Sequence, residues 1–128
     1  ALWSIVDPYA RYNFAVRTEN PRLVQATEDY FVPWDLVHQA NPQEIVSRGD
    51  DACLPPLLVV QGTADANIDH GIPQRFAETY AKAGGHAEYE AFPGMPHQFA
   101  REPGPETDRA ISLMKSFIAR QVHACGGD

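Results

Sequence analysis

The sequence has little of what marks several common classes of protein. Its 128 residues include two cysteines, Cys53 and Cys125, too few for the disulfide framework of a small secreted domain. No run of Lys and Arg is present and the net charge is −7, which argues against a nucleic-acid partner. The longest apolar run, Leu57–Val60, is far shorter than the roughly 20 residues of a membrane span. We therefore expect a globular protein with free thiols, although the spacing leaves a disulfide open.

The start of the chain also lacks familiar features. Residues 1–6 are apolar, but no basic residue precedes them and the run is too short for a signal peptide. We expect a cytoplasmic location. Because the chain has no initiator Met and begins inside an apolar run, we also expect a cut end.

The first half of the chain contains weak patterns for secondary structure. Leu2–Val6 predicts a strand, and residues 9–19 have no clear period and predict a loop. Asn20 followed by Pro21 predicts a short helix to about Ala26. Asn41 followed by Pro42 and Glu44 predicts a second short helix ending near Gly49.

The second half has clearer patterns. Leu57–Gln61 predicts a buried strand, and a helix follows from Pro73 to the glycines at 84–85. Ala87–Phe92 alternates as a strand near a sheet edge does. Thr107 is expected to cap a last helix with a shared apolar face of Ile111, Met114, Phe117, Ile118 and Val122. This order predicts an α/β fold, a three-layer parallel sheet with flanking helices.

Two ionisable side chains follow successive predicted strands. Asp65 lies on a glycine-containing turn after the first, and His97 lies on a similar turn after the second. The carboxyl ends of parallel strands meet at one sheet edge, where ligands bind. An Asp that accepts a hydrogen bond from one imidazole nitrogen leaves the other nitrogen free to deprotonate a hydroxyl nucleophile. We therefore predict Asp65 as the acid and His97 as the general base of a catalytic triad.

Other interpretations apply to the same residues. Taken alone, Asp65 suits a turn and His97 an exposed loop. Asp69 is a rival acid, although its place before Pro73 favours a role at a helix start. Metal binding through Asp69, His70 and another His is weaker, because no His-x-x-x-His or Cys pair at metal spacing occurs. We expect no metal and no cofactor.

A nucleophile for this triad is missing from the sequence. The serines are Ser4, Ser47, Ser112 and Ser116, and none lies in Gly-x-Ser-x-Gly, the strand-turn-helix segment that exposes a catalytic serine. Cys53, just before Pro55, is a poor substitute. The chain alone is therefore expected to be inactive.

The segments 57–65 (LLVVQGTAD) and 92–99 (FPGMPHQF) resemble the end of α/β-hydrolase esterases of the hormone-sensitive-lipase-like and related carboxylesterase type. Residues 2–8 (LWSIVDP) are similar to the strand and turn after the nucleophile segment of that family. The resemblance implies one C-terminal segment, residues 1–128, with the last three strands of an eight-stranded fold. Residues 1–52 would form the first strand and a pocket wall, and residues 53–128 the unit bearing Asp65 and His97.

The resemblance also implies a serine hydrolase that acts on small carboxylic esters, with its serine outside this chain. Phe31 and Trp34 would then either line the substrate pocket or, as we favour, pack in the core. The partners expected are an ester substrate, the missing N-terminal half of the fold and a second copy paired through Leu2–Val6. The competing interpretation is a hydrolase remnant that binds a ligand or protein without catalysis.

Overall fold

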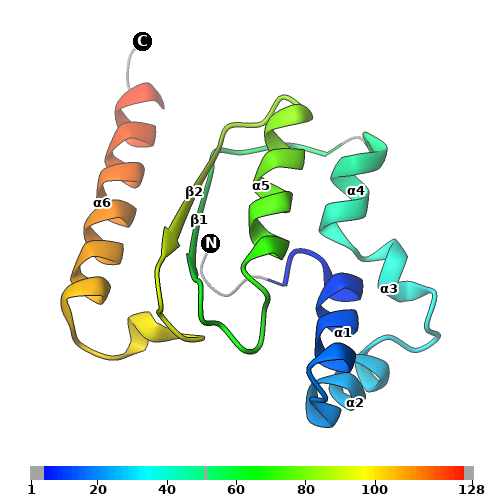
Figure 1. Cartoon of the computed structure of the whole chain (residues 1–128). Helices are drawn as coiled ribbons and strands as arrows, with labels where there is room; N and C mark the ends of the chain where they lie inside the picture. Colours follow the sequence, from blue (N-terminus) through cyan, green and yellow to red (C-terminus); the bar gives the residue numbers. More distant parts are fainter. Residues whose placement is uncertain (1–4, 51, 126–128) are drawn as a thin grey trace.

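The computed structural model describes residues 5–50 and 52–125, without the side chain of Cys125. The helices and strands alternate only in the second half of the chain (Figure 1). In chain order they are α1 (Pro8–Arg17), α2 (Pro21–Tyr30), α3 (Leu36–Gln39), α4 (Pro42–Arg48), β1 (Leu57–Gly62), α5 (Gly71–Lys82), β2 (Ala87–Phe92), the 3-10 helix η1 (Phe99–Arg101) and α6 (Pro105–Cys125). Within these ranges no helix is both long and apolar enough to cross a bilayer.

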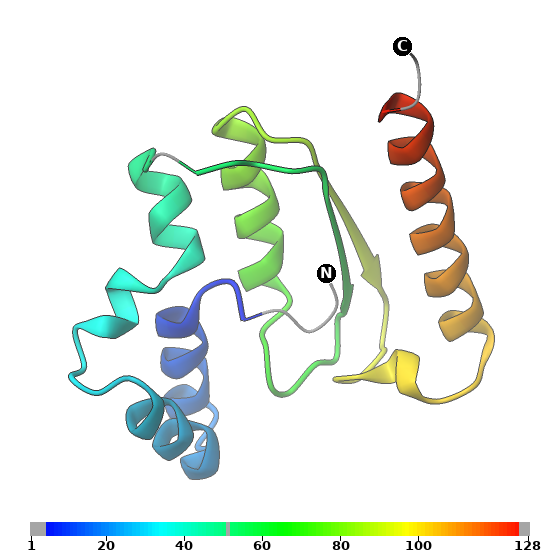
Figure 2. The same ribbon diagram turned by 180° about the vertical axis from the view of Figure 1, so that it is seen from behind.

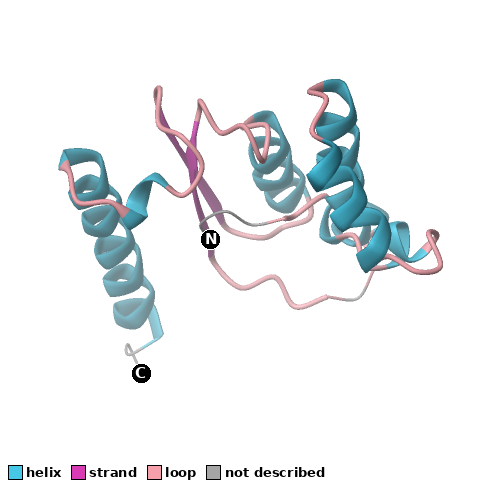
Figure 3. Ribbon diagram, turned by 90° about the horizontal axis from the view of Figure 1, so that it is seen from below, coloured by secondary structure: helices cyan, strands magenta, loops and turns pink. Residues whose placement is uncertain are grey.

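A small parallel sheet organises the second half. β1 and β2 pair in register from Leu57 with Ala87 to Gly62 with Phe92, as both strand predictions require. α5 and α6 lie on opposite sides of this pair, which Figures 1 and 3 show from two directions. The chain therefore has a mixed α/β fold. The predicted third strand falls mostly on residues 1–4, outside the described part, and Ile5 and Val6 are not in a strand.

Successive side chains of the two strands point to opposite faces of the sheet, and each face packs in its own apolar cluster. Leu58, Val60 and Phe92 are buried together with Phe99 and Ala110 on the face toward α6. The other face belongs to α5, whose buried residues Ile72, Phe76 and Tyr80 pack with Val6 and Ile68. Because apolar side chains of the strands alternate between the two faces, each face of the sheet is covered by one of the two helices.

The predicted loop at residues 9–19 is wrong, because residues 8–17 form α1. Asp7 accepts a hydrogen bond from the backbone N–H of Ala10, and Pro8 occupies the first turn, the same start that α2 and α4 use. The helix shows no clear apolar period because only Pro8 and Ala15 are buried in it. Figure 2 shows α1 beside α2, at the side of the molecule away from α6.

The other helix predictions differ in detail. α4 ends at Arg48, close to the predicted end, and Gly49 caps it in the left-handed conformation. α2 runs one turn beyond Ala26, and α5 begins at Gly71, two residues before Pro73.

The expected apolar face of α6 is split. Met114 and Phe117 pack on the sheet, whereas Ile111, Ile118 and Val122 are exposed. Thr107 does not cap α6, since its hydroxyl donates to the carbonyl oxygens of Phe99 and Glu102.

Candidate active site

The turns that follow β1 and β2 are joined at one edge of the sheet. The backbone N–H of Thr63 donates to Phe92 O at 3.0 Å, and that of Ala64 donates to Met95 O at 3.0 Å. In the opposite direction, the N–H of Gly94 in the second turn donates to Thr63 Oγ1 in the first turn at 2.8 Å. These three hydrogen bonds hold the aspartate turn and the histidine turn as one unit.

Gly62 allows the two turns to approach this closely. A Cβ atom at residue 62 would lie 2.2 Å from the carbonyl oxygen of Met95, a distance that real Cβ atoms do not adopt. Gly94 has φ of +73°, the left-handed region that glycine occupies without strain. The geometry that brings Asp65 and His97 together therefore requires the glycines of both turns.

The carboxylate of Asp65 is buried, with 1% of the side chain exposed, and accepts four hydrogen bonds. Oδ1 accepts from the backbone N–H groups of Asn67 at 2.8 Å and Ile68 at 2.9 Å. Oδ2 accepts from Gln61 Nε2 at 2.9 Å and from His97 Nδ1 at 2.8 Å. Each oxygen has two donors, so the burial of this acid is compensated by hydrogen bonds.

The imidazole of His97 is held on one side and open on the other. Nδ1 donates to Asp65, and Nε2 has no hydrogen-bond partner among the described residues. The side chain is 26% exposed, and Nε2 is not one of the buried polar atoms that lack a partner in the described residues. Gln98 follows with φ of +59°, and the buried Phe99 anchors the turn against Phe92, with ring centroids 4.9 Å apart.

Asp69 does not contact His97. Its Oδ1 accepts a hydrogen bond from the N–H of Gly71 at 2.8 Å, where α5 begins. The structure thus brings Asp65 and His97 together and places the rival acid at a helix start.

The described serines lie on helices: Ser47 on α4, and Ser112 and Ser116 on α6. None of these three hydroxyls hydrogen-bonds to His97. Cys53 is an exposed free thiol. Across residues 5–50 and 52–125, no three His, Cys, Asp or Glu side chains gather in a way that could hold a metal ion.

Three residues around Asp65 were not predicted from the sequence. Gln61 and Asn67 contribute donors to the carboxylate, and Arg11 donates from Nε and Nη2 to Asn67 Oδ1 at 3.0 and 2.8 Å. Burial lowers the pKa of Arg11 from its usual value, and the charge of Asp65 partly opposes this shift. The one signal in the sequence that could have found them is the polar Gln61 next to the end of the otherwise apolar strand β1.

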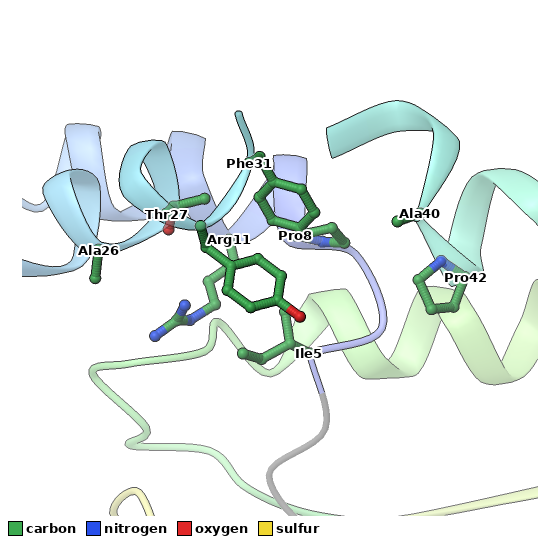
Figure 4. Close-up of a pocket in the computed structure, with 9 residues that line it drawn as sticks. Ile5, Pro8, Arg11, Ala26, Thr27, Phe31, Ala40 and Pro42 are labelled. Atoms are coloured by element: carbon green, nitrogen blue, oxygen red, sulfur yellow. The ribbon is translucent and has the colours of Figure 1, made fainter. Parts of the chain in front are cut away.

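Phe31 and Trp34 are half-buried and lie outside the two core clusters that flank the sheet. The Trp34 ring packs against Tyr12, with centroids 4.8 Å apart, and Phe31 lines a cavity beside Arg11 (Figure 4). Both therefore border surface hollows of the α1–α3 region.

No family model and no curated protein matches the sequence. Among solved structures, the chain is similar to esterase 2 of Thermogutta terrifontis, seen phosphonylated by cyclosarin and phosphorylated by paraoxon, with 28% identity and a TM-score of 0.55. The same thermophilic esterase with propionate bound matches at the same identity and TM-score. Each match covers 62% of this chain and only 29–30% of the esterase, so the chain spans less than a third of that enzyme. The fold is therefore esterase-like.

Proposed function

We propose that this chain supplies the acid and the base of a carboxylic ester hydrolase, an esterase or lipase that uses a Ser-His-Asp triad. Asp65 would orient the imidazole and His97 would act as general base, with the serine outside these 128 residues. The proposal extends to the finer type, a hormone-sensitive-lipase-like or related carboxylesterase, and to a three-layer sheet in which strands outside the described residues continue the β1–β2 pair.

The observation that carries the proposal is the pair formed by Asp65 and His97. A buried carboxylate that accepts from Nδ1 selects the tautomer with a lone pair on Nε2. That atom has no partner within the described residues, and its side chain is partly exposed at the carboxyl edge of a parallel sheet. A serine hydroxyl placed against Nε2 would lose its proton to the ring as it attacks an ester carbonyl, and the imidazolium formed would be stabilised by Asp65.

The similar esterase supports the reaction class. Its phosphorylation by paraoxon shows that it has a nucleophile that attacks an electrophilic phosphorus centre, which is how organophosphates react with activated serines. At 28% identity over 62% of this chain, the likeness extends beyond fold class alone and supports ester hydrolysis as the reaction of the complete protein.

The test starts from the coding sequence that precedes Ala1. We expect it to encode Gly-x-Ser-x-Gly, because chain order in this fold is Ser, Asp, His. The longer protein should hydrolyse 4-nitrophenyl acetate. His97→Ala should reduce turnover by a factor on the order of a million, as loss of a triad member does in a serine protease.

His86→Ala is the matched control, because His86 is also paired with a carboxylate, Glu88, but is exposed on the surface. Its turnover should stay near that of the unmodified protein. An upstream sequence without the serine motif, or equal activity of the two histidine variants, would contradict the proposal and favour a non-catalytic binding module.

A further inference from the structure

The first half of the chain has a surface cavity of about 370 Å³ that takes no part in the Asp65–His97 pair. Its walls are mostly apolar and include Pro8, Ala26, Phe31 and Pro42 (Figure 4). Arg11 is the one charged residue among the described residues that line it. In Figure 4 the nitrogens of Arg11 lie on the side of Ala26, away from Ala40 and Pro42, so the charge is at one end of the cavity.

The charge of Arg11 is only partly compensated. Its Nε and Nη2 both donate to one neutral oxygen, Oδ1 of Asn67. The buried carboxylate of Asp65 acts on Arg11 through its charge, but no carboxylate within the described ranges forms an ion pair with it, in contrast to Arg75, which pairs with Asp7 at 2.7 Å. Nη1 has no hydrogen-bond partner in the described part of the chain. A half-buried guanidinium with a neutral partner and free N–H groups favours an anion beside it.

We propose that this cavity binds a small carboxylate carried on a short apolar chain, with Arg11 as the residue that recognises the charge. The guanidinium presents N–H donors in the planar geometry that suits a carboxylate. The apolar walls would bury the chain, and the volume lies in the range of small-ligand sites.

The position of Arg11 connects this cavity to the proposed chemistry. Asn67, which accepts from Arg11, also donates its backbone N–H to Asp65. Resting on the proposed function, the carboxylate would be either an ionised group of the ester substrate or the free acid released from it. The first source makes the enzyme selective for half-esters of dicarboxylic acids.

Binding can be measured on the 128-residue chain without a serine. Pentanoate is titrated by calorimetry and by NMR chemical shifts of the Arg11 side chain, and pentanamide serves as the uncharged analogue. We expect pentanoate to bind at least about tenfold more tightly, the effect of one charge-assisted hydrogen bond. Arg11→Gln, which keeps a donor for Asn67, should lose this preference, whereas Arg17→Gln, the exposed arginine of the same helix, should retain it.

A second variant tests the cavity with Arg11 intact. Ala26→Phe fills the space between the walls and should weaken pentanoate binding, while circular dichroism matches that of the unmodified chain. Equal binding of pentanoate and pentanamide, or unchanged pentanoate affinity in Arg11→Gln, would overturn the proposal.

The longer, serine-bearing protein separates the two sources. A lower KM for monoethyl glutarate than for diethyl glutarate, lost in Arg11→Gln, assigns the site to the substrate. Equal KM values with inhibition by pentanoate assign it to the free acid. Pentanoate binding without any ester hydrolysis would contradict the proposed function and leave the carboxylate site standing.

Discussion

At the scale of single residues, the hydrogen bonds of Asp65 explain how the acid is held. The two backbone donors come from its own turn, and Gln61 adds a third before His97 contributes the fourth. An uncharged side chain at residue 65 cannot satisfy all four donors. The imidazole is therefore oriented by a carboxylate that has little freedom to move.

In the serine hydrolase that we propose, Asp65→Asn should lower turnover by a factor on the order of 10⁴, because an amide at this position favours the wrong tautomer of His97. Asp69→Asn should have a far smaller effect, since Asp69 only accepts from Gly71. Steady-state hydrolysis of 4-nitrophenyl acetate measures both variants. The opposite ranking would assign the acid to Asp69.

Gly62→Ala should separate the two turns. The added Cβ would lie 2.2 Å from Met95 O, so the backbone must shift, at a cost of about 1–3 kcal/mol in the free energy of unfolding. Gly104→Ala is the control, because a Cβ there has no neighbour within 4 Å. Urea denaturation compares the two variants. Equal midpoints would mean that the turns approach less closely than described.

At the scale of elements, Asp7 joins three helices. Oδ1 accepts from the N–H of Ala10 at the start of α1 and from Asn41, the cap of α4, while Oδ2 pairs with Arg75 of α5. This carboxylate is nearly buried, with 8% of its side chain exposed. Together with the hydrogen bond from Gln43 Nε2 to Thr79 Oγ1 at 2.8 Å, it connects the α1–α4 region to α5.

Asp7→Ala should therefore lower the free energy of unfolding by about 1–2 kcal/mol, mainly through the lost cap, because the Arg75 side chain that loses its ion pair is 56% exposed and screened by solvent. Asp35→Ala provides the comparison, because Asp35 precedes α3 without capping it through its side chain. Thermal or urea unfolding of the two variants tests this. Similar losses would show that Asp7 contributes no more than an ordinary surface acid.

α6 is attached to β2 by ion pairs across the sheet face. Glu88 accepts from Arg120 Nη2 at 2.8 Å, and Glu90 pairs with Arg109. The pKa of Glu88 is lowered, first by its hydrogen bond with His86 and further by Arg120, while burial opposes the shift. A carboxyl with a lower pKa in the folded state stabilises the fold above its unfolded pKa, and this contribution is lost as pH falls through the folded value.

We expect Glu88→Gln to remove part of the stability difference between pH 7 and pH 3. The effect should stay below about 1 kcal/mol, because the Glu88 side chain is 37% exposed and screened by solvent. Urea midpoints at both pH values measure it. A variant whose pH dependence matches the unmodified chain would exclude Glu88 as a contributor.

At the scale of the whole molecule, the imidazole of His97 is held by Asp65, and no serine of the described residues hydrogen-bonds to its Nε2. The described serines are on α4 and α6, away from His97. An oriented imidazole alone contributes little without the nucleophile and oxyanion donors.

The 128-residue chain should therefore hydrolyse 4-nitrophenyl acetate no faster than its His97→Ala variant, both near the rate in buffer. Initial rates at high protein concentration provide the measurement. Activity that disappears on His97→Ala would identify a nucleophile within this sequence.

Local patterns in the sequence determined the second half of the fold and the central pair of the site. Buried and alternating runs predicted β1 and β2, and the order of strand, helix and strand required them to be parallel. Parallel strands end at one edge, so Asp65 and His97 could be paired before any coordinates. Capping residues predicted α4, because a cap and the helical turn that it starts lie within four residues of each other and form a local pattern.

Contacts between distant segments decided the rest. Arg11 and Asn67 are 56 positions apart, so no local pattern marks the contact that links the cavity to the acid. α1 lacks an apolar period because it packs on neighbouring helices through only a few positions. α6 is about 30 Å long against about 20 Å for a six-residue strand, so Ile118 and Val122 extend beyond the sheet they were expected to cover. The burial of a side chain depends on which other segments of the chain pack against it, and the sequence of one segment does not specify those segments.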